Sequence, residues 1–141
     1  MKITLDEGAK MPTRAHPWDA GLDLYAPKEE GVWMISPAGG SITIDTGVHV
    51  AIPEGFTGLI KAKSGLNVKH GLTCTGVIDA HYTGSISVKL YNHHPCLRYD
   101  VRPGDKIAQL VILPCVMPHL ELVDSLEETD RGDGGFGSTG R

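Results

Sequence analysis

The chain has 141 residues, a formal net charge of −4 and 40% hydrophobic residues. This length suits a single domain with a packed core, and the weak negative charge argues against binding to nucleic acid or to an anionic membrane. No apolar run approaches the ~20 residues that a membrane-spanning helix needs.

The N-terminal segment, residues 1–10, lacks the apolar stretch of a signal peptide. An intracellular, cytoplasmic protein is therefore expected, in the host cytoplasm if the source is a virus or phage, with the nucleus as an alternative.

Strand patterns dominate the chain. Apolar and polar residues alternate over residues 41–46, 49–52 and 85–90, which predicts strands with one buried face. Eighteen glycines and nine prolines leave little room for long helices, and residues 67–70 are the best candidate for a helical turn. The pattern predicts an all-β fold, a jelly-roll-like sandwich or distorted β-barrel.

The segment 76–84, Gly-Val-Ile-Asp-Ala-His-Tyr-Thr-Gly, combines an acid with an aromatic residue. Asp79 ends an apolar, strand-like run, and Tyr82 leads toward the strand predicted from Ser85, so a hairpin is expected. A carboxylate held there beside a ring could serve as a general base in a pocket for a flat ligand. An ordinary hairpin with a solvated aspartate fits this segment equally well.

Cysteine usage indicates neither a disulfide framework nor a zinc site. Cys74, Cys96 and Cys115 are odd in number and widely spaced, and we expect them to be small buried side chains. The run His93-His94-Pro95-Cys96 lacks a second ligand pair at metal-binding spacing.

The composition changes near Asp124. Residues 125–133 are acidic, and residues 132–141 are glycine-rich with Phe136 as their only large apolar residue. Composition favours a disordered end, and a flap that orders on a ligand is the alternative. We therefore expect a β-domain over residues 1–124 and a flexible C-terminal arm over residues 125–141.

Five segments occur in a fixed order along the chain. They are Ala20-Gly21-Leu22-Asp23-Leu24, Lys63-Ser64-Gly65-Leu66, the segment 76–84, Gly104-Asp105-Lys106-Ile107-Ala108-Gln109-Leu110, and the glycine-rich residues 131–140. In order and spacing they resemble the trimeric dUTPase family, whose members hydrolyse dUTP to dUMP and pyrophosphate. The resemblance implies a Mg²⁺-dependent homotrimer with shared active sites, which limits uracil incorporation into DNA and supplies dUMP for dTMP synthesis.

The resemblance also implies roles for residues around the base and the sugar. Asp79 would orient the attacking water at the α-phosphorus, and Tyr82 would pack under the deoxyribose and exclude a 2′-hydroxyl. The backbone around Gly76 and Ile78 would read the uracil edge. Asp23 would act on Mg²⁺ through metal-bound waters.

Phosphate contacts come from the other segments. By resemblance, the body of the protein would supply Lys63, Ser64, Gly65 and Gln109. The arm, folded over a site built from three subunits, would supply charge neutralisation, base stacking and phosphate contacts through Arg131, Phe136, Gly137, Ser138 and Thr139.

Two positions depart from the family pattern. Lys63 replaces the usual arginine, which keeps the charge but loses the planar pair of donors, and His81 replaces a second acid. These departures leave open a dUTPase-like regulatory or interaction protein. A dCTP deaminase is a weaker alternative, since that reaction typically uses a glutamate and segment 76–84 has none.

Overall fold

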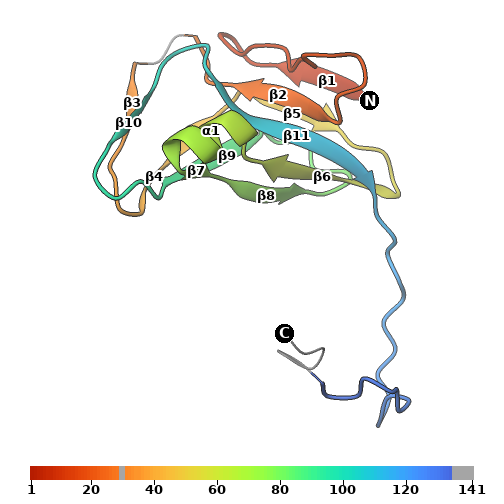
Figure 1. Cartoon of the computed structure of the whole chain (residues 1–141). Helices are drawn as coiled ribbons and strands as arrows, with labels where there is room; N and C mark the ends of the chain where they lie inside the picture. The colour runs from red at the N-terminus through yellow and green to blue at the C-terminus, as the bar shows by residue number, and fades with distance from the viewer. Residues whose placement is uncertain (29–30, 135–141) are drawn as a thin grey trace.

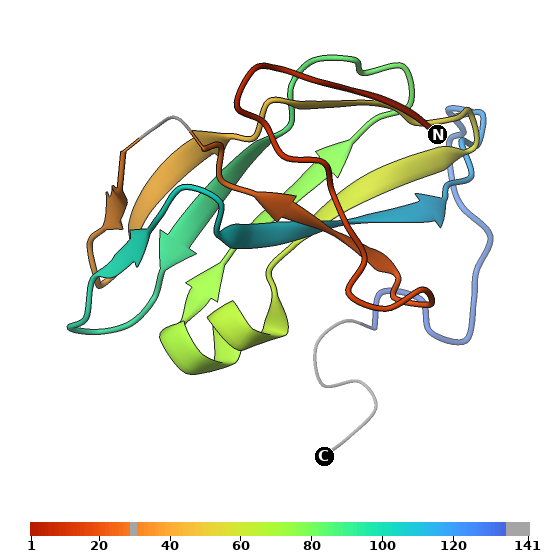
Figure 2. The same cartoon turned by 90° about the horizontal axis from the view of Figure 1, so that it is seen from above.

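A computed structural model of the chain describes residues 1–28 and 31–134. The described residues form short strands and one helix (Figures 1 and 2). In chain order these are β1 (Lys2–Leu5), β2 (Gly21–Tyr25), β3 (Trp33–Ile35), β4 (Gly40–Asp45), β5 (Val48–Ala51), β6 (Phe56–Lys61), α1 (Ser64–His70), β7 (Leu72–Thr73), β8 (Thr75–Ile78), β9 (Ser87–Asn92), β10 (Tyr99–Val101) and β11 (Lys106–Pro114).

The strands pair in small antiparallel sheets. The largest has the order β2-β11-β6-β8, a second has the order β4-β9-β7, and β1 pairs with β5 as β3 does with β10. The predicted all-β class is confirmed. Within the described residues the sheets do not close into a barrel, so the jelly-roll-like alternative describes the chain better than the barrel.

The core lies between the sheets and follows from the alternation of apolar side chains. In β9 Val88 and Leu90 are buried while Ser87 and Lys89 are exposed, and Val88 lies opposite Ile44 of β4. The largest fully buried side chains come from all the described sheets, with none from strands β1 and β8, and from Ile86 in the loop before β9. They are Leu24, Ile35, Ile44, Val48, Ile60, Leu72, Ile86, Val88, Leu90, Val101, Ile107 and Leu110.

The predicted helical turn is the second half of a longer helix. Helix α1 begins at Ser64 and ends at His70, and the following Gly71 terminates it with a φ of 68° and an N–H bond to the Asn67 carbonyl. Glycine adopts this left-handed conformation without a Cβ penalty, which explains the stop.

The predicted hairpin across residues 76–91 is wrong. Strand β8 pairs with β6, whereas β9 pairs with β4 and β7 in another sheet. Residues 79–86, named here the 79–86 loop, carry the chain from one sheet to the other. A tight turn opens this loop: the Tyr82 N–H donates to the Asp79 carbonyl at 3.2 Å, and His81 has a φ of 68°.

Beyond β11 the chain leaves the sheets. Residues 115–134 contain neither strand nor helix, and they extend away from the body of the molecule (Figure 1). Val116, Leu120, Leu122 and Leu126 are almost fully exposed. The predicted boundary between domain and arm at residue 124 remains a prediction.

Of the three cysteines, only Cys74 is buried, and burial raises the pKa of its thiol to about 11. The expectation of burial is wrong for Cys96 and Cys115, which are exposed. No helix among the described residues is both long and apolar enough to cross a membrane.

Candidate active site

One buried carboxylate lies at the centre of a charged cluster. Asp23, on β2, is 4% exposed, and its Oδ1 accepts a hydrogen bond from the Lys63 ammonium at the start of α1. The Lys106 Nζ of β11 lies 2.7 Å from Asp23 Oδ2. Burial raises the pKa of the Asp23 carboxyl, but hydrogen bonds from Lys106 and Lys63 outweigh it and hold the pKa below the ordinary value of 3.8.

A cleft of about 340 Å³ opens beside this cluster, and it is named here the β2–β11 cleft. Gln109 lies opposite Asp23 in the β2–β11 register, and its Nε2 donates to the Ala62 carbonyl at 3.3 Å. Gly21 leaves room for this side chain, because a Cβ on it would lie 2.1 Å from Gln109 Oε1 and the amide would have to move. The lining residues are Ala15, Asp19, Ala20, Gly21, Asp23, Lys63, Gln109 and Val111.

The cleft therefore joins three of the sequence segments that were predicted to act together. Counting Lys106 behind Asp23, two ammonium groups balance the carboxylates of Asp23 and Asp19, so the set is close to neutral, and the Gln109 amide adds a neutral polar group. When Lys63 leaves Asp23 for a ligand, its ammonium group and the Gln109 amide can bind an anion such as phosphate. Ser64 and Gly65 follow Lys63 directly as the first two residues of α1, and both are exposed.

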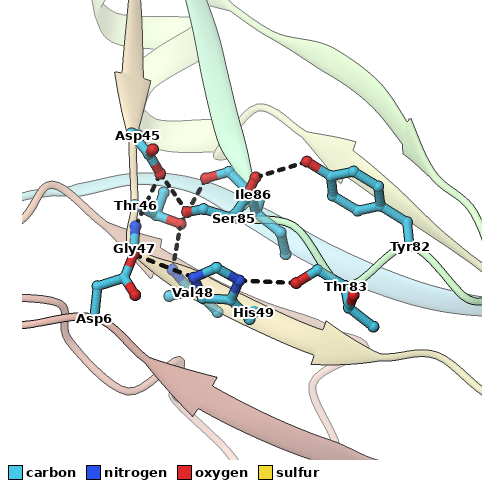
Figure 3. Close-up of polar contacts among 10 residues, drawn as sticks. All are labelled: Asp6, Asp45, Thr46, Gly47, Val48, His49, Tyr82, Thr83, Ser85 and Ile86. Atoms are coloured by element: carbon cyan, nitrogen blue, oxygen red, sulfur yellow. Dashed lines mark hydrogen bonds and ion pairs between the residues drawn. The ribbon is translucent and has the colours of Figure 1, made fainter.

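The 79–86 loop carries the predicted base and the predicted sugar contact. Asp79 is exposed just after β8, and Tyr82 is 47% exposed. The Tyr82 hydroxyl donates to the Ser85 carbonyl at 3.1 Å (Figure 3). The ring lies over Gly84, where a Cβ would come within 2.4 Å of the Tyr82 hydroxyl oxygen. The orientation of the Tyr82 ring therefore depends on the absence of a side chain at Gly84.

Gly76 and Ile78 lie on β8, at the edge of the four-stranded sheet. Gly76 pairs with Ile60 and Ile78 with Gly58, both in β6. Within the described part of the chain no strand pairs with the other side of β8, so its outward backbone groups are available to a ligand.

Within a single chain, Asp79 lies far from the β2–β11 cleft. In the β6–β8 ladder Lys61 pairs with Thr75 at one end and Gly58 with Ile78 at the other. Lys63 lies beyond the first end and Asp79 beyond the second. At about 3.3 Å per residue, the strand separates the two side chains by roughly 15–20 Å.

The C-terminal predictions are only partly described. Arg131 is exposed, and its Nε donates to the Gly134 carbonyl at 3.0 Å, away from the cleft residues. Phe136, Gly137, Ser138 and Thr139 lie outside the described residues.

Sequence reasoning missed Lys106. It belongs to one of the five segments, but nothing local shows that its ammonium reaches Asp23. The β2–β11 register, with its shift between Lys106 and Ala108, brings the two side chains together.

Asp23 was predicted to act on Mg²⁺ through water. Carboxylate oxygens suit this hard cation, but both oxygens of Asp23 are engaged by ammonium groups. No cluster of three potential ligands occurs in residues 1–28 and 31–134. These residues do not fit a resident magnesium ion, whereas one carboxylate can contact the waters of a Mg²⁺ that arrives on a polyphosphate.

Comparison with known proteins identifies the family. The dUTPase family model matches residues 7–140. A deoxyuridine 5'-triphosphate nucleotidohydrolase of Arabidopsis thaliana is 46% identical over 137 residues, which cover 96% of this chain and 80% of the relative. One from Nocardia farcinica is 42% identical over 139 residues, covering 96% and 82%.

Solved structures agree with this result. A dUTPase of Staphylococcus bacteriophage 80alpha, solved with dUpNHpp, superimposes with a TM-score of 0.88 at 32% identity, covering 99% of this chain and 98% of the other. A mutant dUTPase of S. aureus phage phi11, described with a structural Mg(II) ion, gives 0.79 at 31% identity, covering 90% and 98%. This chain belongs to the dUTPase family of enzymes.

Proposed function

We propose that the chain hydrolyses dUTP to dUMP and pyrophosphate, and thereby limits uracil incorporation into DNA and supplies dUMP for dTMP synthesis. One observation carries the proposal: Asp23, Lys63 and Gln109, from three separate family segments, line a single cleft. Family membership provides the activity, and the cleft provides a place for the phosphates.

The β2–β11 cleft binds the phosphate chain in this proposal. Lys63 exchanges its contact with Asp23 for a phosphate oxygen, and Gln109, Ser64 and Gly65 add neutral donors. Lys106 stays paired with Asp23, which prevents the carboxylate from repelling the substrate.

The 79–86 loop and β8 bind the nucleoside. The edge of β8 at Gly76 and Ile78 supplies backbone donors and acceptors for the uracil edge. The Tyr82 ring lies under the deoxyribose and leaves no room for a 2′-hydroxyl. The exposed Asp79 carboxylate accepts a proton from the water that attacks the α-phosphorus, and phosphorus–oxygen cleavage releases pyrophosphate.

The active site is shared between chains of a homotrimer. The distance along β6 and β8 keeps Asp79 of one chain from the cleft of the same chain, so a second copy has to supply one of them. The arm provides Arg131, Phe136, Gly137, Ser138 and Thr139, which neutralise phosphate charge and stack on the base.

A Mg²⁺ ion carried by the substrate would supply charge neutralisation at the phosphates. Asp23 would hold such an ion through its waters, with the carboxylate oxygen that Lys63 leaves when it binds a phosphate oxygen. The protein residues then bind and orient the triphosphate without a resident metal site.

A panel of nucleoside triphosphates with Mg²⁺ tests the proposal. Pyrophosphate release should be rapid with dUTP and slow with UTP, dCTP and dTTP, because the filled 2′ position and the uracil contacts reject the others. Comparable kcat/KM values for dUTP and UTP would contradict the assignment, and ammonia release from dCTP would identify a deaminase.

The Asp79→Asn variant tests the proposed base. It keeps the shape and a hydrogen bond but removes the proton acceptor, so kcat should fall by about 10²–10⁴ with dUTP binding retained. Near-normal kcat in this variant would place the base elsewhere.

A further inference from the structure

His49, on β5, connects two segments that are distant in the sequence (Figure 3). Its Nδ1 lies 2.8 Å from the carbonyl oxygen of Thr83 in the 79–86 loop. Its Nε2 lies 3.1 Å from Oδ2 of Asp6, which follows β1. A carbonyl and a carboxylate only accept hydrogen bonds, so both ring nitrogens must carry a hydrogen for the two bonds to coexist. Only the protonated ring meets this condition.

The contact lies at a functional part of the loop. Thr83 directly follows Tyr82, the proposed sugar contact, whose N–H donates to the Asp79 carbonyl. The far end of the loop has other supports: the Ser85 hydroxyl donates to Asp45, and the Thr46 hydroxyl donates to the Ile86 carbonyl at 2.7 Å (Figure 3). The bonds of Tyr82 to Asp79 and Ser85 are internal to the loop, so His49 links this portion of the loop to β5 and to the segment after β1.

We infer that His49 is a positioning residue for the reaction: its protonated ring, bridging Asp6 and Thr83, fixes the part of the 79–86 loop that presents Tyr82 and Asp79 to the substrate. The inference rests on the proposed dUTP hydrolysis and adds a pH-dependent control to that site.

The charges around the ring support this role. Asp6 faces the ring directly from the segment after β1, and Asp45 lies at the end of β4. Lys2 of β1 and His49 both line an open groove of about 220 Å³. The bond to the Thr83 carbonyl, followed by the bond to Asp6, raises the pKa of His49 above its ordinary value of 6.5. The bridge is therefore complete below pH 6.5 and is lost as the pH rises through the higher pKa of the folded protein.

Loss of the His49 bridge should affect KM more than kcat. A neutral ring keeps one hydrogen, and the ionised Asp6 is the stronger acceptor, so the bond to Thr83 is the one lost. The loop then populates its binding-competent arrangement less often, and the apparent affinity falls by that fraction. Substrate binding then restores the loop before the chemical step. Loss of one hydrogen bond corresponds to a KM increase of about fivefold, with kcat changed less than twofold.

Two substitutions keep the hydrogen bond to Thr83 without requiring a protonated ring at position 49. In Asp6→Asn the amide N–H can donate to an unprotonated Nε2, so the neutral ring with hydrogen on Nδ1 still donates to Thr83. In His49→Asn the side-chain amide replaces Nδ1 as a permanent donor to Thr83. Both variants should keep a low KM for dUTP across the pH range. His49→Phe removes both bonds and should show the high KM at every pH.

The experiment measures KM and kcat for dUTP from pH 5.5 to 9 in the intact assembly of the parent, these three variants and His93→Phe. His93 bonds Thr73 at 2.8 Å on another sheet, so its replacement is a matched control that should follow the parent. The expected result is a KM increase with pH in the parent and the control, and a flat profile in Asp6→Asn and His49→Asn. Parallel profiles in parent and Asp6→Asn would overturn the inference.

A second measurement does not depend on activity. The ¹⁵N chemical shifts of the His49 ring report its protonation, and hydrogen exchange of the Tyr82 and Thr83 amides reports loop order. Relative to the intrinsic exchange rate at each pH, the protection of these amides should fall about fivefold as His49 loses its proton in the parent but not in Asp6→Asn. Amide protection that does not change with the protonation of His49 would overturn the inference even if the enzyme is active. Absence of dUTP hydrolysis by the parent would instead refute the proposed function.

Discussion

At the scale of single residues, the decisive feature is a buried acid whose charge is balanced from two distant parts of the chain. Asp23 lies on β2 among residues of the core sheet, and lysines from the start of α1 and from β11 reach its two oxygens. A buried carboxylate without such partners would cost several kcal/mol. The pair of lysines therefore stabilises the fold, and Lys63 places one ammonium group at the cleft.

Replacing Asp23 with asparagine tests this balance. The amide keeps one acceptor oxygen and turns a donating NH₂ group toward the other lysine, so the free energy of unfolding at neutral pH should fall by about 1–2 kcal/mol. Because the folded pKa of Asp23 is lowered, the difference from the parent should be constant above about pH 5 and shrink as the pH falls below 3.8. Urea unfolding at fixed protein concentration, repeated across the pH range, measures this difference in unfolding free energy.

The control is Asp100→Asn, which removes a partly exposed partner of Arg98. Such pairs contribute about 0.5 kcal/mol or less. Equal losses of unfolding free energy in the two variants at pH 7 would show that Asp23 stabilises the fold no more than a surface ion pair does.

A second residue-scale prediction concerns Gly84. Alanine there would place a Cβ against the Tyr82 ring, which must then move and lose its bond to the Ser85 carbonyl. The preference for dUTP over UTP, as a ratio of kcat/KM, should fall about tenfold. Gly31→Ala, with no atom near its Cβ, is the control. Unchanged preference in Gly84→Ala would mean that the ring does not exclude the 2′-hydroxyl.

At the scale of elements, one buried side chain joins β9 to its surroundings. The Asn92 Nδ2 donates to the Ile35 carbonyl of β3 at 3.1 Å and to the Leu97 carbonyl at 2.9 Å, and Oδ1 accepts from the His94 N–H at 3.0 Å. These bonds hold the β3–β10 pair against the β4-β9-β7 sheet, although the two sheets share no ladder.

The Asn92→Leu variant should therefore lose about 3 kcal/mol of unfolding free energy, because it leaves two carbonyls and one N–H without their partner. Asn67→Ala, which removes one bond near the surface, should lose less than about 1 kcal/mol. Urea denaturation compares them. A loss in Asn92→Leu no larger than in Asn67→Ala would mean that water replaces the three bonds.

At the scale of the whole molecule, the separation of Asp79 from the β2–β11 cleft and the long C-terminal segment both point to assembly. Leu120 and Leu122 are 86% and 101% exposed, and such a series of apolar side chains favours burial against another copy. We expect a homotrimer of about 45 kDa in sedimentation experiments.

Mixing two inactive proteins tests the shared site. One is Asp79→Asn with an intact arm, and the other lacks residues 130–141 but keeps Asp79. If each site takes Asp79 and the arm from different chains, random equimolar trimers should regain about a quarter of parental activity. Each protein refolded alone is the control. No recovery in mixed trimers would place Asp79 and the arm of one chain in the same site.

The sequence alone determined the class of the fold, the family and most of the candidate residues. Alternating apolar residues and frequent glycines act through local geometry, so they identified β4, β5 and the strand that became β9. The order of five segments identified the dUTPase family. The predicted roles of Asp79, Tyr82 and the arm rest on that resemblance and await the experiments above.

Only the tertiary structure decided which strands pair and which charges meet. Local patterns give each strand its faces but not its partner, so β8 and β9 could not be assigned to separate sheets from the sequence. The contacts of Lys106 with Asp23 and of His49 with Thr83 join residues 83 and 34 positions apart, and such contacts depend on strand register. For the same reason the distance between Asp79 and the cleft, on which the shared site depends, becomes visible only in the folded chain.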